Sequence, residues 1–130
     1  MVRISEVDEQ ARMARMKQNL TRARIYRAFR KVLRVYPHLG LQVSRMDLGG
    51  RASVLVHRDS VGDFIFGVQL NMLDPLSLET RVVYQSASAP TGIPCLNPDM
   101  SISDLVIESS QLLMAICEVL EKETRAPAST

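Results

Sequence analysis

The sequence predicts an α+β fold with an N-terminal helix, a four-stranded antiparallel meander, a proline-rich loop that carries a cysteine, and a C-terminal helix. Apolar residues recur at helical spacing near both ends and at strand spacing in the middle, and a proline-rich stretch without periodicity precedes the last helix. With 130 residues, 46% of them hydrophobic, the chain is long enough for a single core. We expect one domain over residues 21–124, a helical extension over residues 1–20 and a disordered tail over residues 125–130.

The residues before Pro37 include no Gly or Pro and predict a helix. Its core side is predicted to hold Ile25, Phe29, Val32, Leu33 and Tyr36, and the opposite side a basic stripe of Arg24, Arg27, Lys31 and Arg34. Met13, Met16 and Leu20 are in phase with the basic stripe. One interpretation is that the helix breaks near Asn19, with Thr21 capping a second helix. Another is that these residues offer an apolar strip to a partner, and a third is a frayed or separately packed extension.

Four strands are predicted in the middle of the chain, over residues 41–48, 52–58, 64–73 and 80–85. Gly49-Gly50 suits a tight hairpin turn, because glycine tolerates positive φ. Phe64 and every second residue to Met72 are apolar, which predicts a strand with one buried face, and Asp74-Pro75 ends it. The short connections favour an antiparallel meander.

Residues 86–100 include three prolines and Cys95 and have no periodicity, which is typical of a functional or mobile loop. The last helix is predicted to start at Ser101, with Asp104 at the capping-box position, and to run to about Glu123. Cys117 falls in the apolar part of this helix and is predicted to lie in the core. His38 and His57 are candidates to pair with Cys95, although structural roles are favoured for both.

The charge is unevenly distributed. Residues 1–36 hold ten basic and three acidic residues, about +7, and the remainder holds six basic and eleven acidic residues, about −5. This split favours a docking surface for an acidic protein over nucleic-acid binding, since the basic region has few aromatic residues to stack on bases. The N-terminus has no apolar secretory segment, no apolar run is long enough to span a membrane, and the two cysteines fit no disulfide or zinc pattern. We therefore expect a cytoplasmic protein without metal or cofactor.

The order of elements resembles the ubiquitin-conjugating enzyme superfamily, including prokaryotic and divergent members. The segments that carry the resemblance are Arg24-Ile25 through Tyr36-Pro37, Gly62-Asp63-Phe64-Ile65-Phe66, Asp74-Pro75, Arg81-Val82-Val83-Tyr84, Ile93-Pro94-Cys95-Leu96 and Ser101-Ile102-Ser103-Asp104-Leu105. The family's His-Pro-Asn tripeptide is missing, and residues 85–88 occupy that region.

The resemblance implies that Cys95 carries a ubiquitin-like protein as a thioester and passes it to an amine. Gln85, Ser86 and Ser88 would then replace the missing asparagine, and the basic stripe would meet the activating enzyme. Two alternatives remain: a catalytically inactive interaction module of this fold, similar to RWD domains, and a secretion-chaperone-like dimer. In all three, the N-terminal helix with Met13, Met16 and Leu20 is a candidate for homo- or hetero-oligomer contacts.

Overall fold

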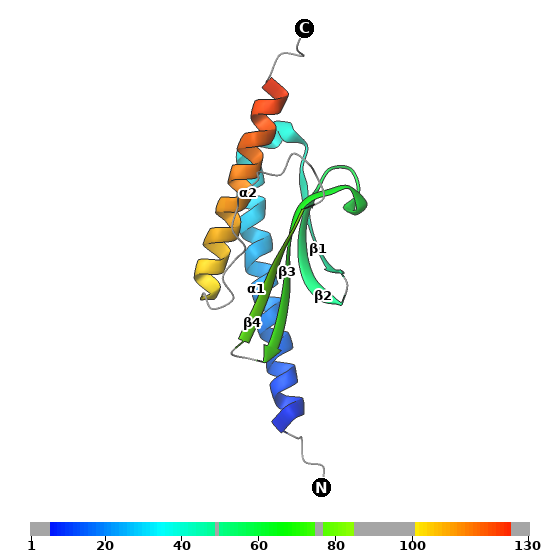
Figure 1. Ribbon diagram of the computed structural model, residues 1–130, viewed down its shortest axis with the longest axis vertical. Helices are drawn as coiled ribbons and strands as arrows, with labels where there is room; N and C mark the ends of the chain where they lie inside the picture. Colours follow the sequence, from blue (N-terminus) through cyan, green and yellow to red (C-terminus); the bar gives the residue numbers. More distant parts are fainter. Residues whose placement is uncertain (1–5, 49, 75–76, 85–100, 126–130) are drawn as a thin grey trace.

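The computed structural model describes residues 6–48, 50–74, 77–84 and 101–125, and nothing is said below of the structure of the others. Its elements are helix α1 (Glu6–Val35), the 3-10 turn η1 (Pro37–Leu39), strands β1 (Gln42–Leu48) and β2 (Arg51–His57), the turn η2 (Val61–Asp63), strands β3 (Phe64–Asp74) and β4 (Ser77–Tyr84), and helix α2 (Ile102–Arg125). The predicted α+β class is confirmed, with an N-terminal helix, the antiparallel strands β1, β2 and β3, and a C-terminal helix (Figure 1).

Helix α1 is continuous over 30 residues. The Thr21 hydroxyl donates a 2.7 Å hydrogen bond to the Lys17 carbonyl one turn earlier, so it bonds within the helix and caps no second one. The interpretation that places a break near Asn19 is therefore wrong. The predicted domain boundary at residue 20 falls inside this helix, where Ala14 is buried and the Gln18 side chain donates to the Leu70 carbonyl at 2.9 Å.

The strands form one sheet in the order β1-β2-β3-β4, and β4 pairs with β3. Gly50 has φ of 77°, as the hairpin prediction requires of this turn. β1 is an edge strand and pairs with β2 from Gln42↔His57 to Leu48↔Arg51.

The core lies between α1, α2 and one face of the sheet. Phe29 packs on Phe66 with ring centroids 5.6 Å apart. The buried apolar residues of α1 include Ile25, Phe29 and Val32, those of the sheet face Ala52, Val54, Val56, Phe66, Val68 and Leu70, and those of α2 Leu105, Leu113, Ile116, Cys117 and Leu120. The predicted core positions of both helices are buried or half-buried.

Helices α1 and α2 lie side by side and run in the same direction (Figure 1). Near the start of α2, Arg24 donates to the Ser103 hydroxyl at 3.3 Å, and near its end Glu121 lies 3.5 Å from His38, just beyond α1. The Ser101 side chain accepts from the Asp104 amide at 3.1 Å, which confirms the predicted N-cap of α2. The N-terminal part of α1 extends past the start of α2.

The prediction that β3 has one buried face is wrong over residues 65–70, because Ile65, Gly67 and Gln69 are buried as well as the core-facing residues. On this second face, the Leu55 side chain lies directly over Gly67, its partner across the β2–β3 pair. A side chain at residue 67 would occupy the space that Leu55 fills. The absence of a side chain at Gly67 is therefore a packing requirement, which apolar periodicity does not reveal.

We predict that Gly67→Ala lowers the free energy of unfolding by about 1–3 kcal/mol, because the added methyl group would overlap the fully buried Leu55 side chain. Gly62→Ala is the matched control, since among the described residues its added methyl group would meet only the Ser60 hydroxyl oxygen, at an ordinary contact distance of 3.8 Å. Urea unfolding followed by circular dichroism measures both. Equal stability of the two variants would contradict the packing assigned to Gly67.

Candidate functional site

The predicted partner-binding residues share one solvent-exposed face of α1. Met13, Met16 and Leu20 are 50%, 56% and 65% exposed, which is unusual for three large apolar side chains on one helix. The four basic residues that follow them are also exposed. We call this set the outward face: Met13, Met16, Leu20, Arg24, Arg27, Lys31 and Arg34. At 1.5 Å rise per residue, it extends about 30 Å along the helix.

A hollow of about 270 Å³ interrupts the outward face where α1 passes the start of α2. It is lined by Lys17, Leu20, Thr21, Arg24 and Arg27 of α1 and by Ile102 of α2. The hollow thus combines an exposed leucine with a basic rim, which suits an apolar side chain that has acidic neighbours. Sequence reasoning did not find Lys17 and Ile102, because their contribution depends on the position of α2 beside α1.

Positive charge on the outward face is not neutralised within the part of the chain that the structure describes. There, Arg27, Lys31 and Arg34 form no ion pair. Arg22, nearer the sheet, differs because its guanidinium lies 3.0 Å from an Asp47 carboxylate oxygen. The unpaired cations therefore give this face a positive potential that attracts acidic molecules.

The outward side of α2 has the opposite charge. Asp104, Glu108 and Glu118 are exposed there. Ile107 and Met114 are also exposed, at 53% and 43%. Each of the two helices therefore presents apolar side chains to solvent. Those on α1 have basic neighbours, and those on α2 have acidic neighbours.

The predicted catalytic residues Cys95, Gln85, Ser86 and Ser88 all lie outside the described residues. Cys117 is buried in the core as predicted. Burial, with a smaller contribution from Glu118 and Glu121, raises the pKa of its thiol to about 12. Cys117 is thus a protonated, inaccessible thiol at neutral pH and is unsuited to nucleophilic attack.

The two histidines have structural partners. His57 is buried and lies 2.7 Å from the Ser44 hydroxyl and 3.0 Å from the Arg58 carbonyl. A carbonyl only accepts, so His57 Nδ1–H donates to it, and in the neutral ring Nε2 accepts from Ser44. The hydrogen bond to Ser44 therefore links β1 to β2, and the one to Arg58 holds the ring at the end of its own strand. His38 meets Glu121 and so joins η1 to α2.

Metal-binding groups and membrane-spanning helices were considered next. Within the described residues, no group of three or more His, Cys, Asp or Glu side chains is placed to hold a metal ion. In the same part of the chain, no helix combines the length and the apolar character needed to cross a bilayer.

Comparison with known proteins yields no relative: no family model, no curated protein and no solved structure matches this chain. The support for the candidate site therefore comes from the geometry of α1 and its neighbours alone.

We predict that Cys117 resists thiol reagents in the folded protein. In a Cys95→Ser variant it is the only thiol, and its labelling by DTNB at pH 8 should be at least about 100-fold slower than in 8 M urea, because the folded thiol is buried and protonated. Stoichiometric labelling within the mixing time, without denaturant, would contradict this assignment.

The raised pKa of the Cys117 thiol also predicts how the free energy of unfolding changes with pH. The unfolded thiol ionises near its ordinary pKa of 9.0 and the folded thiol near 12. Between these values unfolding releases a proton, so the contribution of Cys117 to the free energy of unfolding falls as the pH rises.

Proposed function

We propose that this chain is a protein-interaction domain of the ubiquitin-conjugating-like type that binds an acidic, amphipathic helix of another protein on the outward face of α1. The observation that carries the proposal is the hollow beside Leu20, where exposed apolar side chains join an unpaired basic stripe. Burial of these side chains by a partner would supply affinity, and the basic stripe would supply orientation and rate of association.

The spacing of the outward face supports a helical partner. Met13, Met16 and Leu20 are separated by three and four residues, which is the spacing of a seam between packed helices. Because α1 is continuous, this seam runs without interruption into the region of Arg24, Arg27 and Lys31. A partner helix with leucines on one stripe and glutamates beside it would match both parts.

The proposal predicts that a 21-residue synthetic helix, with leucine at heptad positions a and d and glutamate at e and g, binds the protein. Arg27→Glu/Lys31→Glu should weaken this binding by about tenfold or more and reduce its dependence on salt, because two attractive charges become repulsive. Leu20→Asp should weaken it similarly. Fluorescence anisotropy of the labelled peptide measures each affinity.

Arg30→Glu/Arg45→Glu is the matched control, because it makes the same change in net charge beside Tyr26, off the outward face. A peptide with lysine in place of glutamate controls for apolar binding alone. Equal losses in the two double variants, or equal binding of the two peptides, would refute a docking site on the outward face.

A second copy of the chain is the other partner that the surface charges favour, as in a secretion-chaperone-like dimer. The outward side of α2, with Ile107 and Met114 among acidic residues, resembles the partner helix described above. Light scattering with the peptide absent separates the cases: a dimer that Arg27→Glu/Lys31→Glu dissociates would make the partner a second copy.

The transferase activity implied by the family resemblance is a second candidate function, and the state of Cys117 favours Cys95 as its nucleophile. The chain has two cysteines, and the buried Cys117 thiol is held protonated. Cys95 is then the remaining thiol that can accept the carboxyl group of a ubiquitin-like protein from an activating enzyme, with formation of a thioester and release of the enzyme's own thiol.

For this second candidate, we predict that incubation with a ubiquitin-like protein, its activating enzyme and ATP gives an adduct that dithiothreitol cleaves. Cys95→Ser should abolish the dithiothreitol-sensitive adduct, and Cys117→Ala should leave it unchanged. Non-reducing electrophoresis reads the result. An adduct of the same yield and lability in Cys95→Ser would eliminate Cys95 as the carrier.

A further inference from the structure

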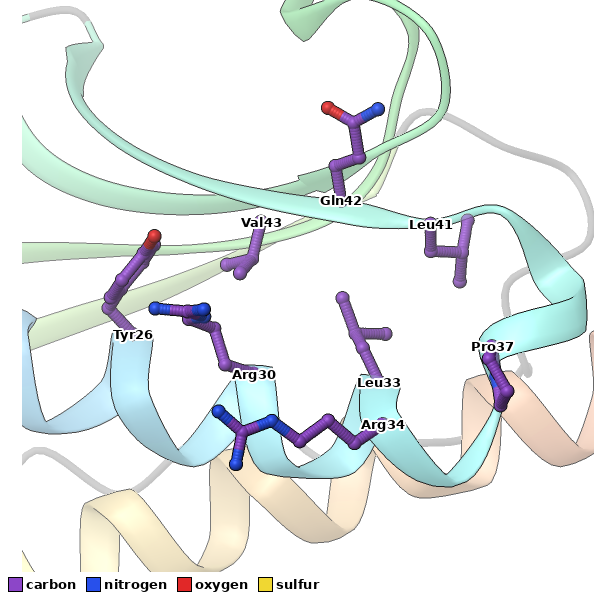
Figure 2. Close-up of a pocket in the computed structure, with 8 residues that line it drawn as sticks. All are labelled: Tyr26, Arg30, Leu33, Arg34, Pro37, Leu41, Gln42 and Val43. Atoms are coloured by element: carbon purple, nitrogen blue, oxygen red, sulfur yellow. The ribbon is translucent and has the colours of Figure 1, made fainter.

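A second surface lies between the C-terminal half of α1 and the edge strand β1, and it shares Arg34 with the outward face. It is a groove of about 440 Å³. Figure 2 shows Tyr26, Arg30, Leu33, Leu41 and Val43 directed into the space between helix and strand, whereas Gln42 points away from it. The groove thus has a mixed lining of apolar, aromatic and basic side chains.

One end of the groove is cationic. The Arg30 guanidinium carbon lies 5.8 Å and the Arg45 guanidinium carbon 4.6 Å from the centroid of the Tyr26 ring. Among the described residues, neither arginine forms an ion pair with a carboxylate. Two guanidinium groups on one ring, both free to bind an anion, make this end suitable for a carboxylate.

The other end of the groove is apolar. Leu33, Leu41 and Val43 are half-buried, and they pack against the core without being covered by it. A small aliphatic side chain placed there would bury their remaining exposed surface.

The backbone beside the groove is an open strand edge. β1 pairs with β2 on one side only. Leu48 and Arg51 are three residues apart and form a hydrogen-bonded pair, so in the alternating antiparallel pattern the backbone groups of Gln42 and Ser44 face β2, whereas those of Val43 and Arg45 face the open edge. Within the described residues, no strand pairs with this edge.

We propose that β1 and this groove bind an extended segment of another protein, which adds to the sheet beside β1 and carries an apolar and an acidic residue two positions apart. Side chains alternate along a strand, and Val43 and Arg45 are likewise two positions apart on the groove side of β1. The apolar side chain would lie on Leu33, Leu41 and Val43, and the carboxylate between Arg30 and Arg45. Backbone hydrogen bonds to Val43 and Arg45 would align the segment.

The charges favour an acidic segment from another protein over a second copy of this chain. Pairing two copies through β1 would bring Arg30 and Arg45 of both toward one another, and none of the described residues that line the groove is acidic. Of the residues that line the groove, Arg34 alone belongs to the outward face, so this site would act together with, or independently of, a helical partner bound there.

The test is binding of a fluorescein-labelled nonapeptide in which the sequence Val-Thr-Asp recurs, measured by anisotropy. We expect Arg30→Glu/Arg45→Glu to weaken binding by about tenfold or more. The matched control Arg27→Glu/Lys31→Glu, with the same charge change on the outward face, should stay within about twofold of the unmodified protein. Binding should also slow hydrogen exchange at the amides of Val43 and Arg45, which face the open edge.

Two altered peptides separate the parts of the proposal. Lysine in place of aspartate should abolish binding. Methylation of the alternate backbone nitrogens that face β1 should also abolish binding, whereas methylation of the nitrogens that face away from β1 should not. Absence of binding by the parent peptide, equal effects of the two double variants, or equal binding of both methylated peptides would each overturn the proposal.

Discussion

The packing of Phe29 on Phe66 fixes the rotational phase of α1, and both candidate binding surfaces depend on that phase. Once Ile25, Phe29 and Val32 are buried against the sheet, the 3.6-residue period decides which residues of α1 face solvent. The continuity of the helix carries this phase back to its first turns. Met13, Met16 and Leu20 therefore cannot turn towards the core, and they remain exposed beside the basic stripe.

The same helix contributes to two surfaces of different chemistry. Its outward face is convex, except for the hollow beside Leu20, and suits a helix laid along it. The side facing β1 forms a groove next to an open strand edge, and it suits an extended chain (Figure 2). Both surfaces present arginine or lysine side chains that form no ion pair among the described residues, whereas the exposed side of α2 carries Asp104, Glu108 and Glu118. The separation of charge between the two helices explains why a nearly neutral chain is expected to select acidic partners.

Local sequence patterns predicted the helices, the core face of α1, the Ser101 cap and the Gly50 turn, because each depends on residues close in the chain. The burial of both faces of β3 was not predictable in this way. At Gly67 the second face is covered by the Leu55 side chain of the neighbouring strand, a contact that a period of two does not report. The break expected near Asn19 was wrong because the Thr21 hydroxyl donates to a carbonyl within the same helix. The sequence does not distinguish a threonine that bonds one turn back from a threonine that caps a new helix.

Of the predicted site residues, those on α1 were placed on one face by helical spacing alone, whereas the hollow and the groove require the positions of α2 and β1. Tyr26, Arg30 and Arg45 were missed because 19 residues separate Tyr26 from Arg45, and only the packing of β1 against α1 brings them together. The predictions for Cys95, Gln85, Ser86 and Ser88 stay predictions, since these residues lie outside the described part of the chain.

The most direct measurement of the central claim is mapping of the acidic leucine–glutamate helix onto the 15N-labelled protein by NMR chemical-shift perturbation. If the acidic helix binds the outward face, the largest shifts should lie in α1 between Met13 and Arg34, with Ile102 at the start of α2, and they should disappear in Leu20→Asp. Shifts centred on β1 or on the outward side of α2, or an unchanged pattern in Leu20→Asp, would contradict the central claim.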